Sequence, residues 1–359
     1  MTSGSPQPRI VITAIGAISA LGGNAEQTTA GVKAAITAFS EYQYLYCNPK
    51  DPEWDDDLPM YVAAVPAIES YITGLSRFTE LAIPPLTETI AKAKLKRQSL
   101  ASTALFIALP QFNQATIKLG LDNLLLPQLL KRTGLQFNKA HLTNEGRVGV
   151  FSLIEKAIPL LNSGELKHCI VGGVDTHLIT EHLALLDQHW RLKSARNIDG
   201  FIPGEAAVML MLETEANAKA RGATPLAVLG TVGVGQEHEI FASEKVSTGQ
   251  GLTCALNSAL AETKDQPISH AYCDFNGESY YAFELGLVMS RLGDVFSNVK
   301  NLSHPADCYG DTGSASGGLL IACATNEFLK NPTKQQRALL WTSIDNGKRM
   351  ALTLESYKA

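Results

Sequence analysis

The segment HPADCYGDTG, residues 304–313, combines residue types that could carry out nucleophilic chemistry. A cysteine near a histidine can act as a nucleophile with its general base, and here Cys308 follows His304 closely. Asp307 and Asp311 stand in the same segment. The alternative interpretation is structural: Cys308 would be a small buried filler, and His304 a loop histidine before a proline.

The other cysteines and histidines indicate no second site. Zinc sites and disulfide frameworks both require regular spacing, whereas the six cysteines have none and form no CxxC pair. The histidines are also scattered, without the spacing of metal ligands. We therefore expect neither a metal site nor a cofactor. The cysteines are Cys47, Cys169, Cys254, Cys273, Cys308 and Cys323.

Two series of alternating strands and helices must position the reactive residues. The first predicts strands at 9–14, 104–109 and 168–171, and helices at 24–38, 78–95, 124–132, 147–161 and 181–191. The second predicts strands at 206–212, 226–234, 270–274, 338–343 and 350–354, and helices at 213–221, 252–263, 280–291 and 317–329. Such alternation predicts parallel sheets covered by helices, in two similar α/β halves, 1–198 and 199–359.

Three local features refine this pattern. Pro84 and Pro85 are expected to kink or divide the helix at 78–95. Gly172 and Gly173 are expected to form a turn after the strand at 168–171. The pair Ser163-Gly164 is a favoured end for the helix at 147–161.

Composition excludes several function classes. The chain has 359 residues, 45% of them hydrophobic, which is enough for a large core. Its net charge is −5, and its Lys and Arg residues do not gather as a nucleic-acid footprint requires. The start lacks a signal-peptide pattern, and no apolar run reaches the roughly 18 residues of a membrane span. We therefore expect a cytoplasmic protein without nucleic-acid partners.

Five stretches of the chain resemble β-ketoacyl-acyl carrier protein synthases, in the order of that family. They are IVITAIGAISALGGNAEQTTAGV, LNSGELKHCIVGGVDT, DGFIPGEAAVMLMLETEANAKARGA, DFNGESYYAFELG and DCYGDTGSASGGL. The third matches the family pattern DGFVxGEGAxxLxLExxxxAxxRGA closely. The region from about Glu41 to Leu142 matches only loosely.

The resemblance implies a thiolase-like fold, with two duplicated α/β halves in a layered α-β-α-β-α core. It also implies a dimer built on an edge strand. The ancestral chemistry it implies is acyl transfer to a cysteine, followed by decarboxylative formation of a carbon–carbon bond.

The position of the family's nucleophile is occupied by Arg147. In the family this cysteine lies about 25 residues before the first Gly of the AGG turn, at the start of the preceding helix. Counting back from Gly172 gives Arg147, and no Cys, Ser or Thr lies within two residues. A guanidinium at a helix N-terminus is unfavourable unless it is paired. Glu145 could pair with it locally, or Arg147 could hold a carboxylate of a partner or ligand.

The family's two histidines are also replaced. The resemblance places Asn276 at the first position and Gly310 at the second, and neither side chain can carry a proton charge. The GFGG gate near the C-terminus corresponds to Ile344, Asp345, Asn346 and Gly347. The glycines that shape the scaffold remain, whereas the Cys-His-His triad is absent.

Three hypotheses follow. The first is a catalytically degenerate homologue resembling chain-length factors: a homodimer, or a heterodimer with an active ketosynthase, that binds an acyl chain or acyl carrier protein in a fatty-acid or polyketide-type pathway. The second is a repurposed acyltransferase that uses Cys308 and His304 near the ancestral pocket. The third is a structural scaffold, which the absence of a cavity would distinguish from the first.

Overall fold

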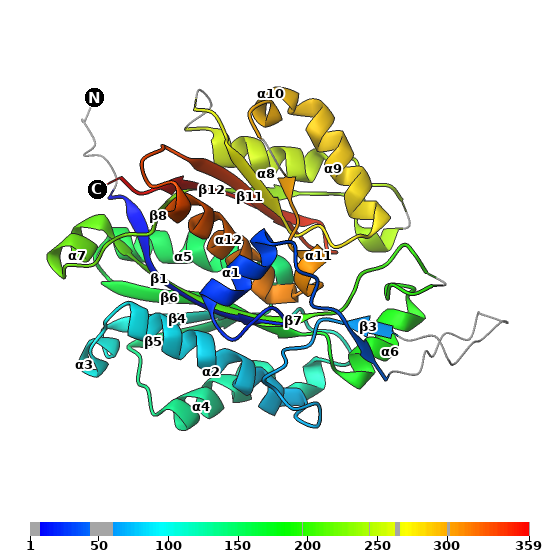
Figure 1. Ribbon diagram of the computed structural model, residues 1–359, viewed down its shortest axis with the longest axis horizontal. Helices are drawn as coiled ribbons and strands as arrows, with labels where there is room; N and C mark the ends of the chain where they lie inside the picture. The colour runs from blue at the N-terminus through cyan, green and yellow to red at the C-terminus, as the bar shows by residue number, and fades with distance from the viewer. Residues whose placement is uncertain are drawn as a thin grey trace.

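The computed structural model describes residues 8–43, 60–195, 197–243, 245–262, 266–299 and 302–358. Ten strands form a sheet in the order β10-β9-β11-β12-β8-β1-β7-β6-β4-β5 (Figure 1). The first five in the chain are β1 (Ile10–Ser19), β4 (Thr103–Ala108), β5 (Lys139–Thr143), β6 (His168–Thr176) and β7 (Glu205–Thr214). The others are β8 (Ala227–Gln236), β9 (His270–Cys273), β10 (Leu302–Ser303), β11 (Arg337–Ser343) and β12 (Lys348–Ser356). A separate hairpin pairs β2 (Ser40–Tyr42) with β3 (Met60–Val62).

The two halves of the large sheet repeat one topology. In the first half β5, β4 and β6 are parallel, and β7 and β1 then follow antiparallel. In the second half β10, β9 and β11 are parallel, and β12 and β8 follow antiparallel. The halves meet where β1 pairs with β8 over Ile10, Val11 and Ile12. The predicted internally duplicated α/β fold is therefore confirmed.

The strand order also suggests where the halves divide. Strand β7 pairs with β1 and β6 of the first half, whereas the division at 198/199 assigns it to the second. The second repeat begins with β8. We propose that the boundary lies in residues 215–226, between β7 and β8, so that each half contains five strands.

Helices cover both faces of each half-sheet, which gives the layers α-β-α-β-α (Figure 1). Helices α2 (Gly74–Lys92) and α4 (Leu121–Thr133) lie outside the first half. Helices α5 (Gly149–Asn162) and α12 (Ser316–Lys330) pack between the halves, and α8 (Gln250–Leu260) and α9 (Ser279–Arg291) lie outside the second. Shorter helices are α1 (Ala25–Lys33), α3 (Arg97–Leu100), α6 (Thr180–Gln188), α7 (Glu215–Ala220), α10 (Gly293–Phe296) and α11 (Ala306–Tyr309).

Burial on both faces explains the apolar sequences of the central strands. Every residue of β1 and of β7 is buried, so these strands are mostly apolar on both faces rather than alternating. The largest core lies around α5 and α12, and both helices contact strands of both halves. Within the described ranges, no helix has the length and apolar character needed to cross a membrane.

Three local predictions differ from the structure. Helix α2 continues through Pro84 and Pro85, so of the two expected effects, a kink or a division, the division does not occur. Strand β6 continues through Gly172 and Gly173 instead of turning there. A Cβ at Gly172 would lie 2.2 Å from the Val208 carbonyl oxygen, and one at Gly173 would lie 2.1 Å from that of Ser314. These glycines therefore permit close packing within a strand. Strand β5 was not predicted.

A buried ion pair holds the segment PGEAA against α2. The Arg77 side chain donates to Glu205 at 2.6 Å and 2.5 Å, and the two side chains are 4% and 0% exposed. Glu205 also accepts from the Val65 amide and the Thr176 hydroxyl, each at 2.8 Å. Both oxygens of this buried carboxylate therefore accept hydrogen bonds.

We predict that Arg77→Met destabilises the protein by about 3–5 kcal/mol, because it leaves the charge of Glu205 buried without its cation. Denaturant unfolding measures this change. The matched control is Arg132→Met. Arg132 lies on α4 and forms a more exposed ion pair with Glu80 of α2, so its loss should lower the free energy of unfolding by at most about 1 kcal/mol. Equal losses in the two variants would contradict the prediction.

Candidate functional site

Arg147 lies at the start of the central helix α5. It is the middle residue of a 3-10 turn, Gly146–Val148, that directly precedes this helix. Gly146 has a φ of 54°, and a Cβ at Gly149 would lie 2.6 Å from the Ala108 Cβ. The turn can therefore press against β4, and Arg147 is buried.

Three carboxylates from the second half surround the Arg147 guanidinium. Asp274 follows β9, Asp345 follows β11, and Asp311 precedes α12. The nitrogen–oxygen distances are 3.7 Å to Asp274, 3.3 Å to Asp311 and 3.4 Å to Asp345. Strands β9 and β11 are parallel, so their carboxyl ends bring two of these aspartates to one edge of the sheet.

Glu145 is not the partner of Arg147. Its carboxylate binds Lys348 at 2.5 Å and also accepts from Thr143 and Ser152. Burial opposes its ionisation, but the hydrogen bonds from Lys348, Thr143 and Ser152 and the charge of Lys348 together outweigh this and lower the pKa of Glu145 to about 2. The expected local pair is therefore wrong, and the compensation for Arg147 comes from the other half of the protein.

Asp311 joins two of the sequence-predicted site residues. The Asn276 amide donates to Asp311 at 2.7 Å, and Asp311 pairs with Arg147. Gly310 presents no side chain; its φ is 72°, and a Cβ there would lie 2.6 Å from the Ile202 carbonyl oxygen. The structure thus brings Asp311, the residue after Gly310, to face Arg147 and Asn276.

A second arginine extends this ionic arrangement. Arg191 donates to the two oxygens of Glu278 at 2.6 Å and 2.7 Å, and to Asp345 at 2.5 Å. The Tyr281 hydroxyl also donates to Asp345, at 2.5 Å, and the Arg147 guanidinium lies 4.7 Å from the Tyr281 ring centroid. We call the following residues the Arg147 cluster: Arg147, His177, Arg191, Asp274, Asn276, Glu278, Tyr281, Asp311 and Asp345.

His177 of the Arg147 cluster has a second histidine, His182, beside it. The sequence gave no indication that these two residues are neighbours at a site. The rings of His177 and His182 are stacked with centroids 5.2 Å apart. His177 Nδ1 lies 2.9 Å from His182 Nε2, and His177 Nε2 lies 3.3 Å from Asp311. His182 is on α6, and only tertiary packing brings it to this position.

Asn113 fixes the direction of this chain of hydrogen bonds. Its side-chain oxygen accepts from the amides of Ala115 and Thr116, so its NH₂ group faces His182 Nδ1 at 3.2 Å. His182 Nδ1 is then an acceptor, His182 Nε2–H donates to His177, and His177 Nε2–H donates to Asp311. This arrangement directs donors toward Asp311, and burial together with the neighbouring His177 lowers the pKa of His182 to about 3.

Opposing effects set the protonation of the three aspartates. Burial disfavours the ionised form of each, but Arg147 and His177 lower the pKa of Asp311, and Arg191 and Arg147 lower the pKa of Asp345. For Asp274 burial outweighs the attraction of Arg147 and raises the pKa to about 6. Asp274 is therefore the carboxylate of the Arg147 cluster whose ionisation costs the most.

A cavity of about 650 Å³ lies beside the Arg147 cluster. Its walls include the apolar side chains of Phe112, Leu185, Phe201 and Phe241, and its polar groups include His189. The segment that matches the family gate, residues 344–347, forms the turn between β11 and β12. In that turn Asp345 faces the two arginines. A cavity thus lies beside the residues that the resemblance assigns to the family's site.

Cys308 and His304 are not arranged as a nucleophile with its base. His304 Nδ1 lies 2.8 Å from the Asp307 carboxylate, and no contact of the described residues joins it to Cys308. Burial raises the pKa of the Cys308 thiol, which disfavours the thiolate. Neither residue lines the cavity beside the Arg147 cluster. Cys47 lies outside the described residues.

The structure is similar to solved ketosynthases over almost its whole length. No protein-family model matches the sequence. The ketosynthase from module 6 of the bacillaene synthase from Bacillus subtilis 168 superposes with a TM-score of 0.76 and 13% identity, covering 98% of this chain and 72% of that one. The ishigamide ketosynthase/chain length factor gives a TM-score of 0.71 and 18% identity, covering 98% and 100%.

A third similar structure is a type II polyketide synthase acyl-carrier protein in complex with its ketosynthase bound to the hexaketide. It gives a TM-score of 0.77 and 14% identity, covering 98% of this chain and 100% of that one. At these identities the similarity defines the fold. The chain has the thiolase-like fold of ketosynthases, as the sequence motifs predicted.

We predict that Asp274→Asn reduces the pH dependence of stability. The pKa of Asp274 is raised from 3.8 to about 6, so its contribution to stability is complete below the lower value and is lost as pH rises through the upper one. Each pKa unit corresponds to about 1.4 kcal/mol, so the loss is on the order of 3 kcal/mol.

The free energy of unfolding, measured by denaturant titration at several pH values, tests this. In the wild type it should decline as pH rises through the ionisation of Asp274, and in Asp274→Asn it should decline less. The exposed Asp122→Asn, in α4, is the control and should follow the wild type. Parallel curves for all three proteins would refute the assignment.

Proposed function

We propose that this chain is a catalytically degenerate ketosynthase homologue that acts as a non-catalytic subunit of a fatty-acid or polyketide-type synthase, in the cytoplasm. The observation that carries this proposal is the Arg147 guanidinium, buried at the position assigned to the nucleophile and paired with Asp274, Asp311 and Asp345. A guanidinium is always protonated and cannot attack a thioester.

The residues opposite Arg147 also lack the imidazole donors that would stabilise the enolate formed by decarboxylation. We assign the second histidine position to Asp311 rather than Gly310, because its side chain faces Arg147 and Asn276. An ionised Asp311 would repel an enolate, whereas a histidine N–H would stabilise it. Asn276 retains one donor group, but Glu278 and Asp311 already accept from it. The site therefore supports neither thioester formation nor decarboxylation.

The cavity beside the Arg147 cluster supports a binding role. Its volume of about 650 Å³ and its mixed apolar and polar walls suit part of an acyl chain. Among the similar structures, one is a ketosynthase/chain length factor and another contains an acyl-carrier protein with its ketosynthase. These support an acyl group or acyl carrier protein as the ligand and an active ketosynthase as one partner.

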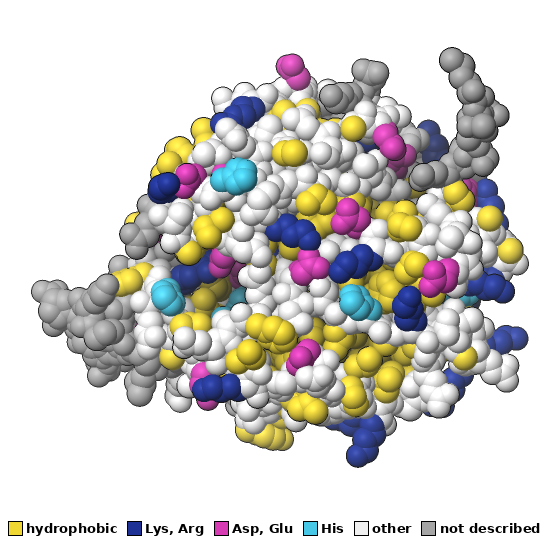
Figure 2. Space-filling view, turned by 180° about the vertical axis from the view of Figure 1, so that it is seen from behind, with side chains coloured by type: hydrophobic (Ala, Val, Ile, Leu, Met, Phe, Trp, Pro, Cys, Tyr) yellow, Lys and Arg dark blue, Asp and Glu magenta, His cyan; other side chains and the backbone are white. Residues whose placement is uncertain are grey.

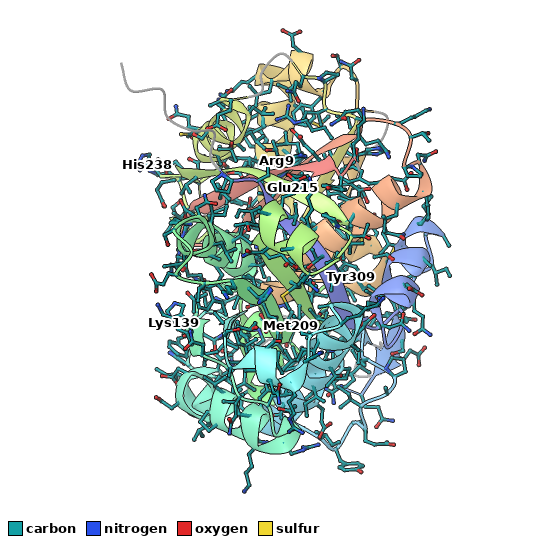
Figure 3. The ribbon with its side chains drawn as sticks, turned by 90° about the vertical axis from the view of Figure 1, so that its left-hand side faces the viewer. Arg9, Lys139, Met209, Glu215, His238 and Tyr309 are labelled. Carbon is teal, nitrogen blue, oxygen red and sulfur yellow. The ribbon has the colours of Figure 1, made fainter. Side chains whose placement is uncertain are left out.

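Strand β5 offers the surface for a partner subunit. It is the last strand of the sheet, and its first three residues, Lys139, Ala140 and His141, are exposed. In Figure 3 Lys139 lies at the margin of the molecule, whereas Met209 of β7 lies in its middle. An unpaired edge can add a strand from a second chain.

Exposed apolar side chains accompany this edge. The amide of Asn144, directly after β5, donates to the Pro110 carbonyl, so the segment with the exposed Phe112 lies beside the end of β5. Ile117 and Leu124 are further exposed apolar residues in the same part of the sequence. Figure 2 shows one face of the molecule, and on it apolar atoms reach the surface in many places among charged groups. These features support either a homodimer or a heterodimer with an active ketosynthase.

The catalytic test is release of carbon dioxide from a malonyl-carrier thioester. We expect none from the purified protein, and none from Arg147→Cys, because restoring the sulfur leaves positions 276 and 311 without imidazoles. An active ketosynthase is the positive control. Robust turnover by the wild type would defeat the proposal, and its loss in Cys308→Ala would favour the acyltransferase alternative.

The partner test introduces a charge into the edge strand β5. We predict that Ala140→Asp weakens subunit association at least about tenfold, because it places a charge in a paired strand edge. Analytical ultracentrifugation measures this for the protein alone and together with a candidate ketosynthase. The exposed Ala67→Asp, in a loop, is the control. Unchanged association of Ala140→Asp would exclude β5 as the interface.

A further inference from the structure

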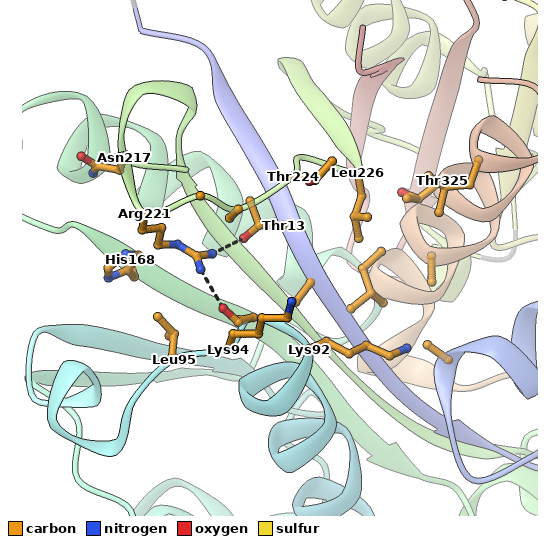
Figure 4. Close-up of a pocket in the computed structure, with 18 of the residues that line it drawn as sticks. Thr13, Lys92, Lys94, Leu95, His168, Asn217, Arg221, Thr224, Leu226 and Thr325 are labelled. Atoms are coloured by element: carbon orange, nitrogen blue, oxygen red, sulfur yellow. Dashed lines mark hydrogen bonds between the residues drawn. The ribbon is translucent and has the colours of Figure 1, made fainter. Parts of the chain in front are cut away.

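A second cavity lies at the opposite ends of the strands from the Arg147 cluster. Its volume is about 920 Å³, and it lies between α1, the end of α2, the start of β6 and the end of α12 (Figure 4). Strand β6 begins at this cavity with His168 and reaches the first cavity with Thr176. The rise of a strand separates the two by roughly 25 Å. We call the second one the basic cavity.

The basic cavity carries uncompensated positive charge. Lys94, Lys96 and Lys167 line it, are exposed, and form no ion pair within the described residues. The one acid among its described lining residues is Glu26, 86% exposed and 3.8 Å from a different lysine, Lys92. Three ammonium groups at one opening attract a multivalent anion.

The other two cations of the basic cavity are already paired. Lys92 binds Glu88 at 2.7 Å. Arg221 binds the buried Glu213 and also donates to Thr13 at 3.2 Å and to the Ala93 carbonyl, as the dashed lines of Figure 4 show. Arg221 therefore holds the cavity wall together, and the three free lysines are the groups left for a ligand.

Two buried polar atoms at the basic cavity also lack partners. The Thr325 hydroxyl is buried and makes no hydrogen bond, and the residue is 1% exposed. His168 Nδ1 is also buried and unpaired, on the opposite side of the cavity from Thr325 (Figure 4). Both atoms are closed off from water, so they lie behind the cavity surface, and the three free lysines are the groups that indicate a ligand.

The backbone conformation of Lys94 is a separate observation that supports a ligand at the basic cavity. Lys94 has a φ of 52°, directly after the end of α2, where glycine is the favoured residue. This conformation is unfavourable for a residue with a side chain. The strain holds a lysine at the opening of the basic cavity, where a glycine would end the helix at less cost.

We propose that the basic cavity binds a phosphorylated small molecule with an apolar body. The phosphate lies at Lys94, Lys96 and Lys167, because a lysine ammonium is a compact charge well suited to phosphate. The body lies against apolar walls that include Ile15 and Leu226. The volume is within the range of about 300–1,000 Å³ typical of small-molecule sites. This site is separate from the function proposed for the Arg147 cluster.

Octyl phosphate is the probe, added to the full chain and followed by titration calorimetry. We expect saturable binding that weakens as salt is added, because exposed charges are screened. Inorganic phosphate and octanoate should bind more weakly, since the first lacks the body and the second carries one charge. Binding of octanol equal to that of octyl phosphate would overturn the proposal, as would no binding of octyl phosphate.

A matched pair of double variants locates the phosphate. Lys94→Gln/Lys167→Gln should lose at least about tenfold in affinity for octyl phosphate. Lys118→Gln/Lys334→Gln removes two exposed lysines that do not line the basic cavity, and should bind as the wild type does. Phe112→Ala, at an exposed residue that lines the first cavity, should also retain binding, which separates this site from the cavity beside the Arg147 cluster. Equal affinity in the two double variants would contradict the assignment.

Discussion

The arrangement of the site depends on compensation of one buried guanidinium. Arg147 is at the start of a central helix, where the dipole already favours anions, and burial removes the solvation of its charge. Asp274, Asp311 and Asp345 supply the compensation, and all three come from the second half of the chain. The two halves therefore share one electrostatic site, and neither half can hold that charge alone.

The duplicated sheet makes this compensation possible. Its parallel strands β9 and β11 end at one edge and place Asp274 and Asp345 there, while the loop before α12 brings Asp311 from a third direction. Glycines permit the close approach: Gly173 lets β6 lie against Ser314, and Gly146 lets the turn at Arg147 form. The scaffold that could position a cysteine and two histidines here positions an ionic cluster.

Much of the fold could be predicted from the sequence, because the long apolar runs of β1 and β7 and the periodic helices α5 and α12 carry strong local signals. Counting from Gly172 places Arg147 at the position that the resemblance assigns to the nucleophile. The partners of Arg147 could not be predicted, because they lie far away in the chain: Asp311 was known only as a neighbour of Cys308. The stacking of His177 on His182 is likewise a tertiary contact without a sequence signal.

We propose that no acyl group can be bound covalently at Arg147, the position that the resemblance assigns to the nucleophile. Intact-protein mass spectrometry after incubation with an acyl-carrier thioester tests this most directly. The unmodified mass alone should be observed, since a protonated guanidinium occupies the position and burial disfavours the thiolate of Cys308. A stable increase by one acyl group, located on the peptide that contains Arg147 or Cys308, would contradict the account.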